Sequence, residues 1–173
     1  MVKKVSYAGV FTAVITVLTM GSVPIGIGGG YVHIGDSIIF LCCFIMPLPY
    51  CAIAAGVGSA FADLILGFTA YALPTLLIKM LMAVIVRLFL GRNDSVAACV
   101  VSFIVASLFM QAGYLLFNFL YYGEKAGIVL ILINLTQTVA SIPVAYLLIK
   151  AVKRVPDLES VRKEWRNEYK GDR

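Results

Sequence analysis

The chain has 173 residues, of which 61% are hydrophobic and only 13% charged, and its formal net charge is +5. Because a soluble domain carries about 45–50% apolar and ~25% charged residues, too few polar side chains are present to cover a water-facing surface. The composition therefore argues against a soluble enzyme, a disordered segment and a nucleic-acid-binding protein, and it indicates a membrane protein with about one domain.

Six apolar segments follow one another along the chain, separated by glycine, proline or charged residues. We expect membrane spans at about residues 5–22, 36–46, 50–66, 74–90, 95–122 and 126–152. The second segment is short for a bilayer that needs about 20 apolar residues per helix, unless it lies inside the bundle. Asp94 or Ser95 is expected to cap the fifth helix. The sequence thus predicts an all-α membrane protein, with a six-transmembrane-helix bundle over residues 1–153.

Basic residues mark one side of the predicted bundle. Lys3 and Lys4 precede the first span, Arg92 lies between the fourth and fifth spans, and eight of the 14 Lys and Arg residues lie at 150–173. By the positive-inside rule, these regions and both termini are expected in the cytoplasm. Residues 154–173 form either a mixed-charge helix or a solvated extension, and we expect their basic side chains to hold this cytoplasmic tail near anionic lipid.

No pattern of catalytic residues is visible. The four cysteines lie in apolar segments without metal-ligand spacing, and His33 is the only histidine. The glycine-rich residues 25–30 follow a predicted span rather than a strand, which favours a flexible loop or lid over a phosphate-binding loop. We therefore expect neither enzymatic activity nor a metal or other cofactor.

Four ionisable residues, Asp36, Asp63, Lys79 and Arg87, lie within or beside the predicted spans, where each costs about 2.5–3.5 kcal/mol. Arg87 lies about three residues from the cytoplasmic end of its helix and is expected to snorkel. Asp36 opens the second segment and either caps its helix or contacts a ligand. Lys79 lies five residues past Pro74, about 7–8 Å into the membrane, from where it either snorkels outward or faces a site. Asp63 is interpreted as an ion-pair partner of Lys79 or as a ligand-binding residue.

Uncharged polar residues share one face of each of the last two spans. Tyr114 and Asn118 are spaced i, i+4 in the fifth span, and Asn134 and Gln137 are spaced i, i+3 in the sixth. These side chains can simply hydrogen-bond between helices. Because Lys79, Asn118 and Asn134 are expected at similar depth, they also fit the wall of a small-molecule site open to the outside. The predicted substrate-binding residues are His33, Asp36, Lys79, Tyr114, Asn118, Asn134 and Gln137.

Small residues at four-residue spacing indicate close helix contacts. The first span contains two such pairs, Ala8 with Thr12 and Gly9 with Ala13, and the third span has small residues at positions 54, 58 and 62. For the third span we expect packing inside the bundle. For the first span, the sequence is compatible both with docking of an external partner and with internal packing.

Several motifs occur in an order that resembles a known family. They are Gly30-Tyr-Val-His-Ile-Gly-Asp36, Ala55-Gly-Val-Gly58, Ala62-Asp63-Leu, Gly67-Phe-Thr-Ala-Tyr71 and Pro74-Thr-Leu-Leu-Ile-Lys79. In order and spacing they resemble the substrate-binding S components of energy-coupling factor (ECF) vitamin transporters. The resemblance is densest over residues 30–80, and length and span count agree with it over residues 1–153.

This resemblance implies a six-helix bundle that captures a vitamin or vitamin precursor from outside with high affinity. The expected substrate is riboflavin, hydroxymethylpyrimidine or a pyridoxine-like molecule, with residues 23–34 as the lid. The resemblance also implies a membrane T component and two cytoplasmic ATPases as partners in the plasma membrane of a bacterium. Docking to the T component would use Ala8, Gly9, Thr12 and Ala13. A stand-alone secondary transporter of a small polar metabolite is the alternative, and a structural membrane protein without a ligand is a third possibility.

Overall fold

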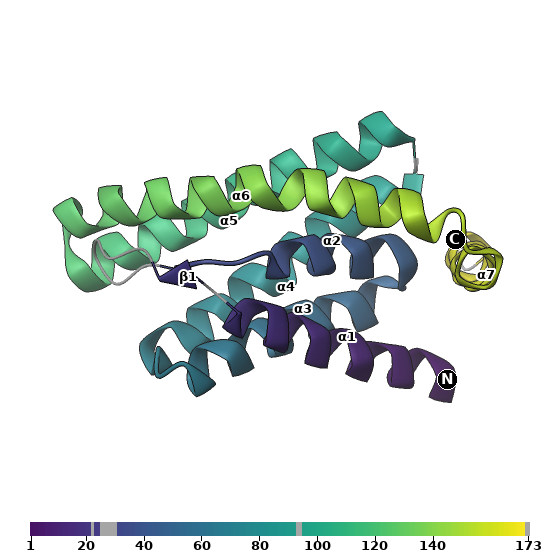
Figure 1. Cartoon of the computed structure of the whole chain (residues 1–173), viewed down its shortest axis with the longest axis horizontal. Coiled ribbons are helices and arrows are strands. Elements are labelled where there is room, and N and C mark those ends of the chain that lie inside the picture. Colours follow the sequence, from purple (N-terminus) through teal and green to yellow (C-terminus); the bar gives the residue numbers. More distant parts are fainter. Residues whose placement is uncertain (22, 25–30, 93–94, 172–173) are drawn as a thin grey trace.

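The computed structural model describes residues 1–21, 23–24, 31–92 and 95–171. These residues form the helices α1 (Val2–Met20), α2 (Gly35–Ile45), α3 (Leu48–Ile65), α4 (Thr69–Arg92), α5 (Val96–Tyr122), α6 (Glu124–Val152) and α7 (Pro156–Gly171). Two short strands between α1 and α2, β1 (Val23–Pro24) and β2 (Tyr31–Val32), pair antiparallel with Val23 opposite Val32. Apart from this small β-pair, the described chain is helical, as the sequence predicts (Figure 1).

Helices α1 to α6 form a bundle in which successive helices reverse direction (Figure 1). α3 makes its most extensive contacts with α4 and α1, and α5 packs against both α4 and α6. Small residues permit the close approach of α3 to α1, since a Cβ atom added at Gly58 would lie 2.8 Å from the carbonyl oxygen of Thr12. The packing role predicted for the small residues of the third span is therefore confirmed.

Within the described part of the chain, five helices contain segments long and apolar enough to cross a membrane, namely α1, α3, α4, α5 and α6. The remaining apolar helix, α2, has only 11 residues, which corresponds to about 16 Å against a hydrocarbon core of ~30 Å. Ten of the 11 residues are buried, and α2 contacts α1, α3, α4 and α6. α2 thus lies inside the bundle, as its length requires. The six-span count itself stays a prediction.

α4 begins earlier than the sequence suggests. The expected start is near Pro74, but the helix begins at Thr69 and includes Pro74. Proline is tolerated in membrane helices because neighbouring groups compensate for the lost backbone hydrogen bond. Residues 69–73 therefore belong to the helix rather than to an outer loop, and every later residue of α4 lies further from the start of the helix than expected.

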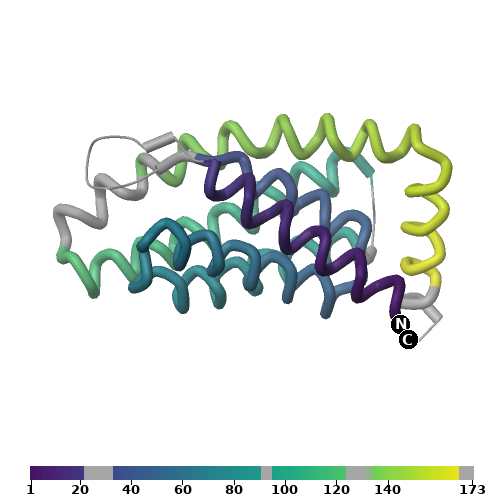
Figure 2. Tube along the Cα trace, turned by 60° about the horizontal axis from the view of Figure 1, so that its bottom comes forward, coloured from purple at the N-terminus to yellow at the C-terminus, as the bar shows by residue number. Residues whose placement is uncertain are grey.

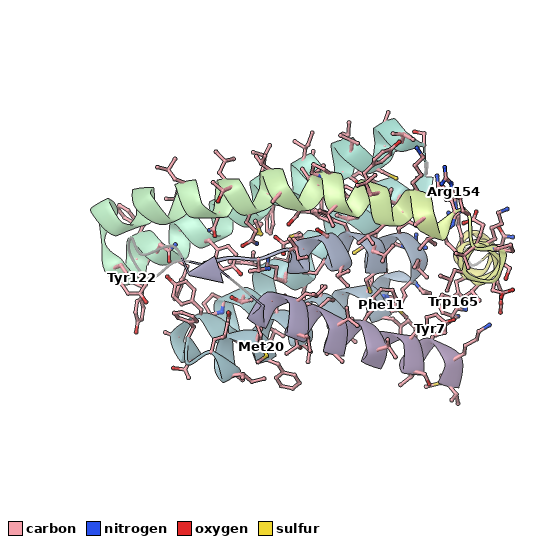
Figure 3. All side chains as sticks on the ribbon, in the orientation of Figure 1. Tyr7, Phe11, Met20, Tyr122, Arg154 and Trp165 are labelled. Carbon is pink, nitrogen blue, oxygen red and sulfur yellow. The ribbon has the colours of Figure 1, made fainter. Side chains whose placement is uncertain are left out.

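α7 crosses the end of the bundle at which α1 begins (Figure 2). Its Trp165 is 2% exposed and meets Tyr7 of α1 edge to face, with the ring centroids 5.3 Å apart (Figure 3). Arg162 lies 4.6 Å from the ring centroid of Phe44, near the end of α2, and Lys153 lies 5.3 Å from the same ring. Of the two alternatives for the tail, the mixed-charge helix is confirmed, and the structure adds that this helix packs against the bundle. The assignment of this end to the cytoplasm stays a prediction.

Candidate functional site

A buried ion pair joins α2 to α4. Lys79 Nζ donates a hydrogen bond to Asp36 Oδ1 over 2.5 Å, and each side chain is 2% exposed. Because α4 starts at Thr69, Lys79 lies about 15 Å along the helix, roughly twice the distance from the helix start that the sequence suggests. The pair therefore sits near the middle of the bundle, and the alternative in which Lys79 snorkels outward is wrong.

Asp63, the partner that the sequence suggests for Lys79, has a different place. It is 2% exposed and lies near the end of α3, two residues before Ile65. Its backbone carbonyl accepts a hydrogen bond from the Phe68 amide, 2.8 Å away, in the turn that leads into α4. The ion pair forms with Asp36 instead, because the short helix α2 carries that residue into the interior.

α6 completes a group that we call the central polar cluster, consisting of Asp36, Lys79 and Gln137. Gln137 Nε2 donates to Asp36 Oδ2 over 2.6 Å, so each carboxylate oxygen has its own donor. One turn further along α6, the carbonyl oxygen of Ser141 accepts a hydrogen bond of 3.0 Å from Ser37 Oγ. The polar face predicted for this helix therefore faces α2.

α5 supplies one wall of the cluster. Lys79 Nζ also donates to Met110 Sδ over 2.9 Å and lies 5.8 Å from the centroid of the Tyr114 ring. The Tyr114 hydroxyl donates to Thr75 Oγ1, 3.0 Å away and one turn before Lys79 on α4. The ammonium group thus contacts a carboxylate, a thioether and an aromatic ring, and the structure brings Tyr114 to the cluster.

His33 lies directly before the cluster, where the chain enters α2. It is 6% exposed, and its Nδ1 accepts a hydrogen bond of 3.0 Å from the Gly35 amide. Because Nδ1 accepts, the ring is neutral and carries its proton on Nε2. Glycine is required at position 35, since a Cβ atom there would collide with the Thr19 hydroxyl and the His33 ring. His33 is close enough to Asp36 and Lys79 to interact with both electrostatically.

Asn118 belongs to a second polar contact, nearer the end of the bundle opposite α7. It is 2% exposed, and its Oδ1 accepts a hydrogen bond of 2.7 Å from the Tyr71 hydroxyl. Tyr71 packs edge to face against Phe117 and stacks on Tyr122, with centroid distances of 5.0 and 6.1 Å. Figure 3 shows Tyr122 at the opposite end from Trp165. Aromatic residues at this level are typical of a membrane–water interface.

Asn134 and the predicted lid lie on the α6 side of the bundle. Asn134 is half-buried, one turn before Gln137. β2, which belongs to the predicted lid at residues 23–34, contacts α6, whereas residues 25–30 of that lid lie outside the described part of the chain. The roles of Asn134 and of the lid in binding stay predictions.

The two small-residue pairs of α1 face different ways. Gly9 and Ala13 are exposed, and a Cβ atom added at Gly9 would meet nothing within 4 Å. Ala8 and Thr12 are half-buried, and Thr12 Oγ1 donates a hydrogen bond of 2.8 Å to the Ala8 carbonyl. Gly9 and Ala13 are therefore the pair that leaves room for a partner helix.

Thr75, Tyr71 and Met110 take part in these polar contacts but were not among the predicted site residues. Thr75 and Tyr71 lie on α4, respectively four and eight residues before Lys79, and this spacing is a usable signal because such residues share a helix face. Met110 lies four residues before Tyr114. Its role as a hydrogen-bond acceptor cannot be predicted from the sequence, because a methionine in a hydrophobic segment looks like any other apolar residue.

Residues 1–154 match the family of the S component of ECF-type riboflavin transporters. The chain is also 31% identical over 129 residues to a protein of Pyrococcus woesei described as an "uncharacterized protein in gap 3'region". That alignment covers 74% of this chain and 86% of the relative. The match confirms the resemblance drawn from residues 30–80, and the five long apolar helices agree with a multi-pass membrane protein. The chain belongs to the family of S components of ECF-type riboflavin transporters, which capture vitamin-type substrates.

Proposed function

We propose that this chain is the substrate-capture subunit of an ECF importer and that it binds riboflavin, or a vitamin of similar chemistry, from the non-cytoplasmic side. Family membership supports a vitamin-type substrate. The observation that carries the proposal is the central polar cluster, since three helices bring hydrogen-bonding groups to one point inside an apolar bundle. A small number of polar groups that converge in an apolar wall is typical of a small-molecule site.

The charges of Asp36 and Lys79 cancel, so the cluster suits a neutral ligand. Lys79 and Gln137 donate hydrogen bonds and Asp36 accepts them, and a neutral ligand can exchange bonds with all three without adding charge. A phosphate ester would add negative charge where Lys79 already pairs with a carboxylate, which is costly away from water. Riboflavin has carbonyl groups and an imide N–H on a neutral ring that can lie against Tyr114, and its hydroxyls are on the ribityl side chain. We therefore expect riboflavin to bind in preference to its phosphate ester.

The proposed importer contains a membrane T component and two cytoplasmic ATPases, in the plasma membrane of a bacterium. The positive-inside rule supports a cytoplasmic location for both ends of this chain, because Lys3 and the exposed Arg154 lie at the α7 end of the bundle. Gly9 and Ala13 are the proposed contacts with the T component, since both are exposed and small enough for a close helix approach.

The first experiment identifies the substrate. The purified full chain is denatured, and the released small molecules are identified by mass spectrometry, followed by titration with riboflavin, its phosphate ester, hydroxymethylpyrimidine and pyridoxine. Riboflavin in the extract and saturable riboflavin binding support the proposal. A chain that releases no small molecule and binds none of the four contradicts it. Gradient-driven uptake by proteoliposomes that lack an ATPase would instead favour a secondary transporter.

The second experiment tests the binding residues. Lys79→Met should weaken riboflavin binding by about 10–150-fold, because a hydrogen bond to a charged group contributes ~1.5–3 kcal/mol. Asn134→Ala is expected to weaken binding less, as its side chain is only half-buried. The matched control is Lys163→Met, which removes an exposed lysine of α7. Unchanged affinity in both site variants would show that the ligand uses another face of the bundle.

The third experiment tests the docking face. Gly9→Leu should abolish uptake by the complete importer while leaving riboflavin affinity unchanged, since position 9 is exposed and a Cβ atom added there would meet nothing within 4 Å. Val10→Leu is the control, because Val10 is its exposed neighbour and already carries a branched side chain. Loss of both uptake and riboflavin binding in Gly9→Leu would count against a docking role.

A further inference from the structure

A groove between α5 and α6 lies near the end of the bundle that α7 crosses. Its volume is about 210 Å³, and it is lined by Val96, Cys99, Tyr146, Ile149, Lys150 and Lys153. Cys99 and Ile149 are buried, whereas Val96 and both lysines are exposed at the rim. The groove thus combines an apolar floor with a cationic rim.

Two further features favour a negatively charged group at this rim. The first turn of α5 begins at Val96, and the positive end of a helix dipole attracts anions. Lys153, whose ammonium group lies 5.3 Å from the centroid of the Phe44 ring, is exposed and lines the groove. Lys150 is exposed one turn earlier on α6. An anion at the rim would therefore meet two lysines and a helix N-terminus.

The surroundings of the groove favour lipid over a water-soluble anion. α5 and α6 both contain segments long and apolar enough to cross a membrane, so in a bilayer acyl chains would surround their outward faces. A small soluble anion would leave the apolar floor empty, whereas a phospholipid fills it. In the orientation supported by the positive-inside rule, this end faces the cytoplasmic leaflet, which is rich in anionic lipid.

We propose that the groove binds one anionic phospholipid, with its phosphate between Lys150 and Lys153 and the first part of an acyl chain against Val96, Cys99 and Ile149. The site is separate from the central polar cluster, because its lining comes from the first turns of α5 and the last turns of α6. The lipid site does not depend on the identity of the vitamin.

The test uses the purified full chain and native mass spectrometry. The protein is incubated in detergent with equal amounts of phosphatidylglycerol and phosphatidylcholine of different mass, and the retained lipid is counted. The wild-type chain should retain one phosphatidylglycerol selectively. Lys150→Gln/Lys153→Gln should lower that retention roughly tenfold. Val96→Trp, which fills the groove without changing charge, should lower it to a similar extent.

The control is Lys3→Gln/Lys163→Gln, which removes the same charge from two lysines whose side chains are 55% and 66% exposed. Its phosphatidylglycerol retention should match the wild type, and circular dichroism of every variant checks the fold. Equal loss in the control pair, equal retention of phosphatidylcholine, or full retention in Val96→Trp would overturn the proposal. Displacement of the lipid by inorganic phosphate at matched concentration would show a simple anion site and would also overturn it. If the double variant unfolds, Lys150→Gln alone and Val96→Trp decide the question.

Discussion

The ion pair between Lys79 and Asp36 makes a strong prediction for stability. Lys79→Met removes the cation and leaves a carboxylate that is 2% exposed, with the Gln137 amide as a neutral donor. Breaking a buried pair by removing one partner costs about 3–5 kcal/mol, because the remaining charge loses its compensation. Asp36→Asn is expected to cost a similar amount, since it leaves the ammonium group without its counter-charge.

The double variant Asp36→Asn/Lys79→Met carries neither charge. Replacing a buried ion pair by uncharged groups often changes stability little. The free energy of unfolding of the double variant is therefore expected to lie within about 1 kcal/mol of that of the wild type. The coupling energy between the two positions is then about 5 kcal/mol or more, above the ~0.5–3 kcal/mol that is usual for contacting residues.

The assay is equilibrium unfolding in mixed detergent micelles with increasing dodecyl sulfate, followed by circular dichroism. Lys163→Met serves as the control, because Lys163 is 66% exposed and its loss should change the free energy of unfolding by less than ~0.5 kcal/mol. A loss of less than about 1 kcal/mol in Lys79→Met, or strictly additive effects in the double variant, would refute the ion pair as described.

Three further predictions concern α7 and the helix contacts. Trp165→Ala should release α7 from the bundle, because truncating a buried tryptophan costs roughly 3–5 kcal/mol; faster tryptic cleavage after Arg162 with unchanged riboflavin binding would confirm it. Hydrogen bonds from Arg162 hold the pKa of Glu159 below its usual range. The stabilisation of α7 by Glu159 is therefore complete above its unfolded-state pKa and is lost as the pH falls through the lower folded-state value. An acid titration of Trp165 fluorescence measures this loss, and Glu159→Gln should remove that part of the pH dependence. Gly58→Ala should lower the free energy of unfolding by about 1–3 kcal/mol, since the added methyl group meets the α1 backbone, whereas Gly9→Ala should leave it within ~0.5 kcal/mol in the same detergent titration.

Much of the bundle can be predicted because membrane helices are recognisable from local sequence features. Apolar length and turn residues identify α1, α3, α5 and α6, and Ser95 caps α5 as predicted by accepting a hydrogen bond of 3.2 Å from the Ala98 amide. The early start of α4 is missed because Pro74 reads as a boundary in sequence, although a membrane helix accommodates it.

The pairing within the site depends on tertiary structure and is harder to predict. The sequence shows that burying Asp36, Asp63 and Lys79 costs free energy unless each is paired, but it does not show which carboxylate pairs with the ammonium group. That outcome depends on α2 lying inside the bundle, where it brings Asp36 to Lys79 although the two residues are 43 positions apart in the chain. The buried face of α7 is hard to recognise in the sequence for another reason, because charged residues separate Val161 from Trp165.

The central position of α2 has a consequence for membrane insertion. Asp36 would cost about 2.5–3.5 kcal/mol in lipid without its partners, and 11 residues are too few to span the hydrocarbon core. Lys79 and Gln137, the residues that compensate this charge, belong to helices synthesised after α2. The second apolar segment therefore cannot settle at its final depth when it leaves the ribosome, and its entry into the bundle waits for α4 and α6.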